Sequence, residues 1–109
     1  MRNTNFPVAT YKMPILKNWL RRTPQFWFFS DNKGKAGIYR WVNLKNAKMY
    51  IGFSTNLMKR LKAYYNVNLL INVNMPIYKA ILKHGHSSFS LDILEYCEPK
   101  FLIDRESLF

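Results

Sequence analysis

The sequence predicts a small α+β domain, built on a three-stranded antiparallel β-sheet flanked by helices in the order β-β-α-α-β-α. Two short runs rich in Ile, Tyr, Trp and Phe, at residues 36–42 and 48–53, surround an Asn-containing connection. Two helical patterns follow, and residues 89–94 then alternate as a third strand. A chain of 109 residues suffices for a single hydrophobic core.

The two aromatic and β-branched runs are expected to form a β-hairpin. In the second run, alternation sends Met49, Ile51 and Phe53 to one face of the strand. Tyr50 and Gly52 then lie on the opposite face.

In the first run, Tyr39 shares its face with Gly37 and Trp41. Whether Tyr39 and Tyr50 meet depends on the strand register, which the sequence leaves open.

A helix is predicted after the hairpin, from Asn56 to about Tyr65, with Ser54 or Thr55 as its N-cap. Its apolar residues share one face, and its basic residues point in other directions. Because the helix follows the second strand directly, Arg60 is expected to emerge near the hairpin.

The rest of the chain alternates loop, helix, strand and helix. Residues 66–74 are Asn-rich and are expected to form a loop. Pro76 is well placed in the first turn of a helix that Gly85 ends. The alternating strand follows, and Pro99 is expected to open a last helix.

Residues 1–35 are expected to be an N-terminal extension of a domain that spans residues 36–109. Three prolines interrupt any long helix in the extension, and a run of turn-forming residues ends it near Gly34. The aromatic run at residues 26–29 needs burial or a partner. A strap packed on the domain explains it best, and contact with a membrane or a nucleic acid is the alternative.

The charge of the chain favours a polyanionic partner. Seventeen Lys and Arg residues against six Asp and Glu residues give a net charge of +11. The charge is uneven: residues 1–90 contain fifteen basic residues and one acid, whereas residues 91–109 contain two basic and five acidic residues. One reason for a late acid would be a carboxylate that holds a metal ion next to phosphate. A solvated acidic helix face accounts for most of these acids.

Other functional classes are disfavoured by composition. The single Cys97 excludes an intramolecular disulfide and a thiolate cluster. No apolar stretch approaches the roughly 20 residues that span a bilayer, so a soluble, intracellular protein is expected. His84 and His86 flank Gly85, and they are more readily explained as cap and loop residues than as a proton shuttle.

Two half-motifs and their spacing resemble a known family. Gly37-Ile38-Tyr39 and Tyr50-Ile51-Gly52 lie on the predicted hairpin, Arg60 lies on the next helix, and Glu106 lies on the last one. This ordered set resembles the GIY-YIG nuclease superfamily. Strings such as GIYRWVNL and FSLDILEYCEP are similar to endonucleases encoded in introns of fungal mitochondrial genomes. The resemblance covers residues 36–109 and implies the GIY-YIG nuclease fold, incomplete at its C-terminus.

The resemblance implies a DNA endonuclease that hydrolyses phosphodiester bonds with one divalent metal ion, magnesium, in intron homing and in the mitochondrion. Tyr50 would be the general base or would orient the water, and Tyr39 would be hydrogen-bonded nearby. Arg60 would clamp the scissile phosphate, Tyr64 would support it, and Glu106 would bind the metal. Contacts with the nucleic-acid backbone are expected from four further residues: Arg40, Lys48, Lys59 and Lys62.

Each of these roles has a structural alternative. Tyr39 and Tyr50 also fit as ordinary strand aromatics, and Tyr64 fits as a packing residue. Phe53 stands where many members of the family have a Lys, so activation of the tyrosine would rely on the metal or on other cations. The competing function is a catalytically inactive, basic nucleic-acid-binding remnant of such an endonuclease. A monomer is expected, and a monomer with one site should nick double-stranded DNA.

Overall fold

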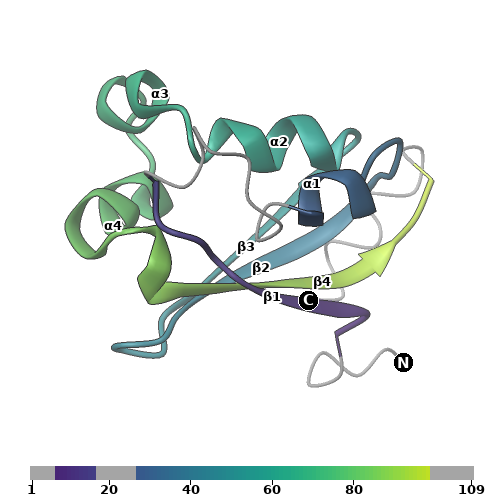
Figure 1. Cartoon of the computed structure of the whole chain (residues 1–109), viewed down its shortest axis with the longest axis horizontal. Helices are drawn as coiled ribbons and strands as arrows, with labels where there is room; N and C mark the ends of the chain where they lie inside the picture. The colour runs from purple at the N-terminus through teal and green to yellow at the C-terminus, as the bar shows by residue number, and fades with distance from the viewer. Residues whose placement is uncertain (1–6, 17–26, 99–109) are drawn as a thin grey trace.

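The structure is a computed structural model, and it describes residues 7–16 and 27–98. The described helices and strands form two layers, with the helices over one face of a β-sheet (Figure 1). In chain order they are β1 (Ala9–Lys12), α1 (Trp27–Asp31), β2 (Gly37–Asn43), β3 (Met49–Ser54), α2 (Leu57–Ala63), α3 (Val67–Asn72), α4 (Pro76–His84), the 3₁₀ turn His86–Ser88 and β4 (Phe89–Tyr96). The predicted α+β class and antiparallel sheet are confirmed.

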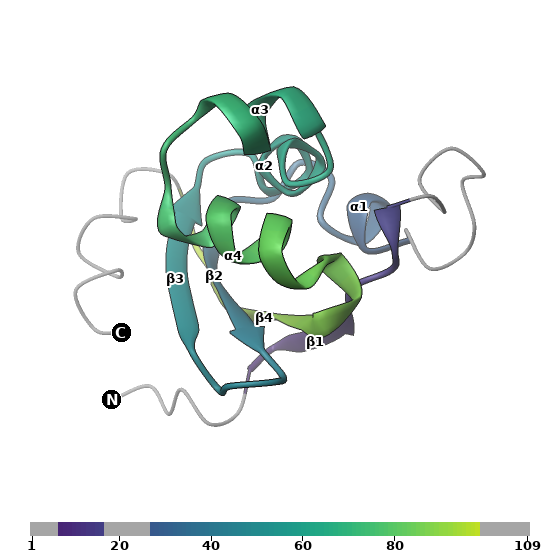
Figure 2. The ribbon, with the colours of Figure 1, turned by 90° about the vertical axis from the view of Figure 1, so that its left-hand side faces the viewer.

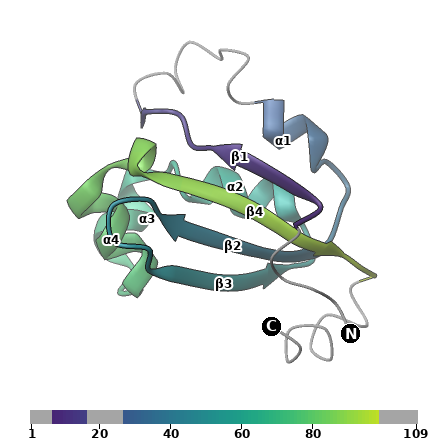
Figure 3. The same ribbon diagram turned by 90° about the horizontal axis from the view of Figure 1, so that it is seen from below.

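The sheet has four strands in the order β1-β4-β2-β3, not the three that the sequence predicts (Figure 3). The added strand is β1, which pairs antiparallel with β4 from Ala9 opposite Ile93 to Lys12 opposite Ser90. Four residues are too few for an alternation signal, so only a partner strand reveals β1. Part of the predicted extension therefore belongs to the sheet, and the domain boundary after residue 35 stays a prediction.

The register of the hairpin fixes which side chains share a face. Tyr39 lies opposite Gly52, on the face that the helices cover. Arg40 lies opposite Ile51 on the other face, which no helix of the described residues covers (Figure 3). Tyr50 pairs with Trp41 and so lies on the helix side, opposite in direction to Ile51. The predicted alternation of the second strand is confirmed.

The helix after the hairpin, α2, begins at Leu57, one residue later than the predicted start at Asn56. Asn56, rather than Ser54 or Thr55, is the N-cap of α2, and its side-chain oxygen accepts the backbone N–H of Lys59 at 3.1 Å. Ser54 Oγ instead accepts the backbone N–H of Asn56 at 3.0 Å. Ser54 therefore shapes the turn that precedes the cap.

The segment predicted as a loop, residues 66–74, contains the short helix α3, so that prediction was wrong. Asn66 caps α3 with its side chain, and the asparagines that indicate a loop in the sequence serve as cap and surface residues. The helix that starts at Pro76 is confirmed as α4, and Gly85 ends it with φ of 81°. The last predicted helix, from Pro99, lies outside the described residues.

The core lies between the helices and the covered face of the sheet. Trp41, Tyr64 and Phe89 are fully buried, and the Trp41 and Tyr64 ring centroids are 4.7 Å apart. From the aromatic run of the N-terminal segment, Phe28 and Phe29 are buried, which supports the expected packed strap. Among residues 7–16 and 27–98, no helix has the length and apolarity needed to cross a membrane.

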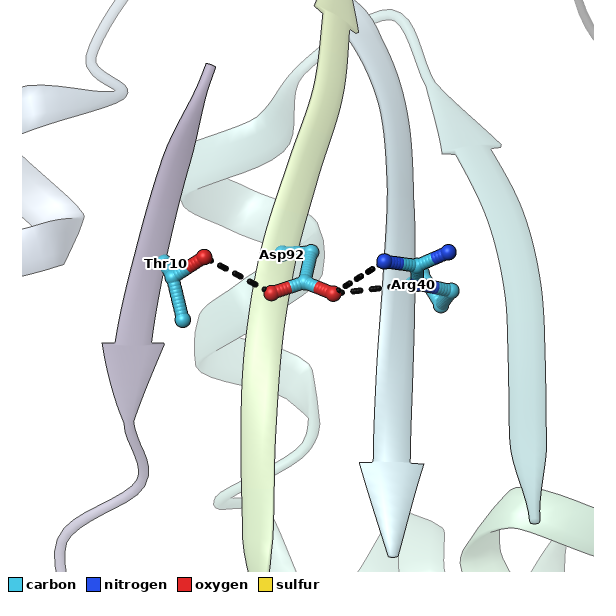
Figure 4. A network of polar contacts seen from close by, with 3 residues as sticks. All are labelled: Thr10, Arg40 and Asp92. Atoms are coloured by element: carbon cyan, nitrogen blue, oxygen red, sulfur yellow. Dashed lines mark hydrogen bonds and ion pairs between the residues drawn. The ribbon is translucent and has the colours of Figure 1, made fainter. Parts of the chain in front are cut away.

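The open face of the sheet carries a charged network across three strands (Figure 4). Asp92 on β4 accepts Arg40 Nε at 3.0 Å and Arg40 Nη2 at 2.7 Å, and Thr10 Oγ1 donates to its other oxygen at 2.8 Å. The side chains of Arg40 and Asp92 are only 13% and 8% exposed. This network joins β1, β4 and β2 through their side chains.

Replacing Asp92 with Ala should lower the free energy of unfolding by about 2–4 kcal/mol, because it leaves the Arg40 guanidinium largely desolvated without a carboxylate. Urea unfolding measures the loss. The double variant Arg40→Met, Asp92→Leu should regain much of it, since an apolar pair of similar volume needs no charge partner. A stability of Asp92→Ala within about 0.5 kcal/mol of the parent would contradict this role.

His86 fastens the end of α2 to the turn before β4. Its ring is buried, stacks on Tyr65 at a centroid distance of 4.1 Å, and places Nε2 2.6 Å from the carbonyl oxygen of Tyr64. Burial lowers the pKa of His86 below its usual value, and the hydrogen bond to Tyr64 offsets this only in part. His86 is therefore neutral in the folded protein at neutral pH.

Acidification should destabilise the fold through His86. The unfolded chain binds the proton near the usual pKa, about 6.5, and the folded chain binds it only at lower pH. Stability is therefore complete above that value and falls as the pH drops through it. Urea midpoints at about pH 7.5 and pH 5 should differ more for the parent than for His86→Gln. His84→Gln is the control, and an equal pH response in the parent and His86→Gln would refute the assignment.

Candidate active site

A hollow of about 300 Å³ opens between β3, α2 and the start of α4. Its lining is partly polar and partly apolar. The polar part consists of three tyrosines and one cation, and the lining residues are Tyr39, Tyr50, Arg60, Tyr64, Gly52, Ile51, Phe53, Met75 and Ile77. The structure thus brings together four of the five residues predicted to be catalytic. The fifth, Glu106, lies outside the described residues.

Tyr39 is hydrogen-bonded to two other polar residues of the lining. Its hydroxyl lies 2.8 Å from the hydroxyl of Tyr64 and accepts a hydrogen bond from Arg60 Nε at 3.2 Å. The ring lies over Gly52, where a Cβ atom would stand 2.6 Å from the Tyr39 hydroxyl oxygen. Only glycine leaves room for the ring at this position. The glycine of the second half-motif therefore positions the tyrosine of the first.

Arg60 reaches the hollow from α2, as expected from its place after the hairpin. Its guanidinium carbon lies 5.5 Å from the centre of the Tyr64 ring. Burial lowers the pKa of Arg60, but the hydrogen bond and the attraction of Tyr39 outweigh it, and the net pKa is raised. None of the described residues that line the hollow is an acid. Arg60 thus presents a positive charge that the described part of the site does not neutralise.

Tyr64 has both a packing and a polar role. It is 2% exposed, and its ring packs against Trp41 and Tyr78. Burial, followed by the neighbouring Tyr39, raises the pKa of Tyr64 well above its ordinary value. Tyr64 therefore stays protonated and is able to donate its hydrogen bond to Tyr39.

Tyr50 is half-buried and lines the hollow from β3. It lies on the same face as Tyr39 but two positions from its cross-strand partner, so the two residues are diagonal neighbours. Among the described residues, the hydrogen bonds of the Tyr39 hydroxyl run to Arg60 and Tyr64, with none to Tyr50. The expected hydrogen bond between Tyr39 and Tyr50 is absent from this set.

The residues expected to contact the nucleic-acid backbone divide into two groups. Lys48, Lys59 and Lys62 are exposed, and Lys62 lies 6.0 Å over the Phe29 ring, on the α1 side of α2. Arg40 differs from them, because its side chain is 13% exposed and is paired with Asp92 on the open face of the sheet. Sequence alternation already separates Arg40 from Tyr39, but only the structure reveals the carboxylate that engages it.

The described residues fit the phosphate side of a nuclease site but do not form a metal site by themselves. Between residues 7–16 and 27–98, no group of three His, Cys, Asp or Glu side chains lies close enough to hold a metal ion. Glu106, the predicted metal ligand, lies outside the described residues.

Sequence reasoning missed three contributors to the hollow. Two of them, Met75 and Ile77, flank Pro76 and line the hollow at the start of α4. Their signal in the sequence is the helix-starting proline, which does not show that the helix begins beside β3. The third is Gly52, whose part of the motif was known but whose contact with Tyr39 depends on the register.

The comparisons with known proteins agree with this geometry. Residues 35–109 match the family of the GIY-YIG catalytic domain. Two solved structures are similar to the chain. One is a mutant of the catalytic domain of intron endonuclease I-TevI, with a TM-score of 0.56 and 27% identity, covering 68% of this chain and 78% of that one. The other is the catalytic domain of homing endonuclease I-TevI, with a TM-score of 0.54 and 28% identity, covering 68% of this chain and 83% of that one. No curated protein matches the chain. The family match covers most of the chain, and together with the fold and the hollow it shows that the chain belongs to the GIY-YIG family as a nuclease catalytic domain.

Proposed function

We propose that the chain is a DNA endonuclease that hydrolyses phosphodiester bonds with one divalent metal ion, magnesium. The observation that carries this proposal is Arg60, which is hydrogen-bonded to Tyr39 in a hollow where no described residue neutralises its charge. The net charge of +11 favours the same polyanionic substrate.

Arg60 binds the scissile phosphate in this proposal. Its Nε is engaged by Tyr39, and its two terminal nitrogens make no hydrogen bond to another described residue. A guanidinium offers donors in a planar fork that matches two phosphate oxygens. The same donors would stabilise the additional negative charge on phosphorus as the water attacks.

The tyrosines prepare the water. Tyr64, which burial keeps protonated, donates a hydrogen bond to the Tyr39 oxygen in this arrangement, since Tyr39 then keeps its own proton for the hollow. The Tyr39 oxygen then accepts two hydrogen bonds, and its own proton is free to turn into the hollow. Tyr50 faces the same space from β3 and orients the water or accepts its proton.

Glu106 completes the proposed site. A divalent ion held by its carboxylate would supply charge neutralisation at the leaving oxygen. Lys48, Lys59 and Lys62 are exposed and bind phosphates that flank the cut. The resemblance to intron-encoded enzymes and the likeness to the homing endonuclease support a role in intron homing, in mitochondria, with a monomer that nicks one strand at a time.

Purified protein should nick supercoiled plasmid in the presence of magnesium, and Arg60→Ala should nick about 10²–10³-fold more slowly because one transition-state cation is removed. Glu106→Ala should be comparably impaired. Gel densitometry of relaxed against supercoiled plasmid measures the rates. Lys83→Ala, at the exposed end of α4, is the charge-matched control and should nick like the parent.

The inactive nucleic-acid-binding protein is the alternative that this experiment separates. Plasmid binding with no nicking by the parent would favour it. Equal nicking by the parent, Arg60→Ala and Glu106→Ala would remove both residues from the catalytic assignment. Thermal unfolding of each variant shows whether a loss of rate reflects a loss of fold.

Gly52→Ala should slow nicking about 10²-fold, because its Cβ would stand 2.6 Å from the Tyr39 hydroxyl oxygen and displace the ring from Arg60 and Tyr64. Tyr39→Phe added to Gly52→Ala should cost little more, since the displaced hydroxyl no longer contributes. Thr55→Ala, exposed at the start of the next turn, is the control. Fully additive losses in the double variant would contradict positioning of Tyr39 by Gly52.

A further inference from the structure

The open face of β3 carries exposed apolar side chains directly beside the hollow. Ile51 is 42% exposed and Phe53 is 41% exposed. Both residues border the hollow, and their side chains point to the face of the sheet away from Tyr39 and Tyr50. In the described sheet β3 is the last strand, at one margin of the sheet (Figure 2). Single exposed apolar residues are common in proteins, but neighbouring ones at the rim of a functional hollow indicate a contact surface.

The two side chains form one continuous platform. They are two residues apart on one strand and therefore point to the same face, about 7 Å apart along it. Their cross-strand partners on β2 are Arg40 and Ile38, on the same face. Asp92 already pairs with Arg40. The platform thus consists of an aromatic ring and a branched aliphatic side chain, and the ion pair of Arg40 with Asp92 lies beside it on the same face.

We propose that Phe53, supported by Ile51, stacks on a nucleobase next to the scissile phosphate and holds it out of the base stack. The inference rests on the proposed function, which places a phosphate on Arg60. Arg60 lies in the hollow on the helix side of β3, whereas the Phe53 side chain points to the other side of this strand, which is the margin of the described sheet. A ligand that passes over this margin meets a cation and then an aromatic ring, so it needs an anionic group next to a planar apolar one. A nucleotide has this chemistry, and aromatic rings bind unstacked bases of any sequence.

A second copy of the chain is the less favourable occupant of the platform. Each copy has a net charge of +11, so two copies that approach each other repel electrostatically. A nucleic acid brings the opposite charge to the same place. The platform also adjoins the hollow across the margin of the described sheet, whereas an interface between copies does not require a neighbouring hollow.

The unstacked base also has a mechanistic consequence. The hollow is recessed between β3, α2 and α4, and a phosphate in a regular duplex is held in a smooth, stiff backbone. Holding one neighbouring base out of the stack bends the backbone locally and lets a phosphate enter. Phe53 would then affect rate and site preference without taking part in the chemistry.

The test measures binding of a single-stranded oligonucleotide that contains 2-aminopurine, in EDTA, by quenching of its fluorescence. Phe53→Ala should bind about tenfold or more weakly and quench less, because one base–aromatic stack is lost. Phe53→Trp should retain both. Met49→Ala is the matched control: Met49 lies on the same strand and face, is 57% exposed, and does not line the hollow.

Salt dependence separates stacking from phosphate binding. Phe53→Ala should leave the slope of log affinity against log salt unchanged, whereas Arg60→Ala should reduce its magnitude by about one. Equal affinity and quenching for the parent, Phe53→Ala and Met49→Ala would overturn the proposal. Sedimentation tests the other occupant, a second copy of the chain. A parent dimer that Phe53→Ala converts to a monomer would also overturn the proposal.

Failure of this inference is distinguishable from failure of the proposed function. A parent that nicks plasmid, together with a Phe53→Ala variant that binds and quenches like the parent, removes only the base platform. A parent that never nicks, together with a tenfold weaker Phe53→Ala, removes the endonuclease and retains the platform as a nucleic-acid-binding surface.

Discussion

The contact between Tyr39 and Gly52 across β2 and β3 is the constraint on which the site depends. The ring can lie over residue 52 only because this residue has no Cβ atom, and this places the hydroxyl within reach of Arg60 and Tyr64. The two half-motifs are therefore one structural unit. The first supplies the functional group, and the second supplies the space that the group needs.

The alternation of side chains along β2 places the residues of the hollow on one face of the sheet and the charged network on the other. One face of β2 directs Tyr39 and Trp41 toward the helices, and the other directs Arg40 toward Asp92. A slip of one residue in the register would place the charged network in the apolar core and the tyrosines outside. The network of Arg40 with Asp92, which is costly to bury and costly to break, thus also favours the register that the site requires.

Much of this arrangement could be predicted from the sequence, and the misses have a common cause. The hairpin, α4, its start at Pro76 and its end at Gly85 follow from local signals, and so does the opposite orientation of Tyr50 and Ile51. The strand β1 and the short helix α3 were missed because each is too short to show a period and exists through its neighbours. The roles of Arg40 and Tyr64 depend on partners more than 20 residues away, which no local pattern reveals.

The same cluster explains why Tyr64 combines two roles that the sequence presents as alternatives. A packing residue must be buried, and burial raises the pKa of Tyr64 and keeps its hydroxyl protonated. This hydroxyl lies 2.8 Å from the Tyr39 oxygen and is able to donate to it, and Arg60 also donates to the same oxygen. His86 holds the backbone of Tyr64 in place through its carbonyl group. Packing is thus the means by which Tyr64 orients Tyr39, and an exposed tyrosine at this position would have neither the fixed geometry nor the retained proton.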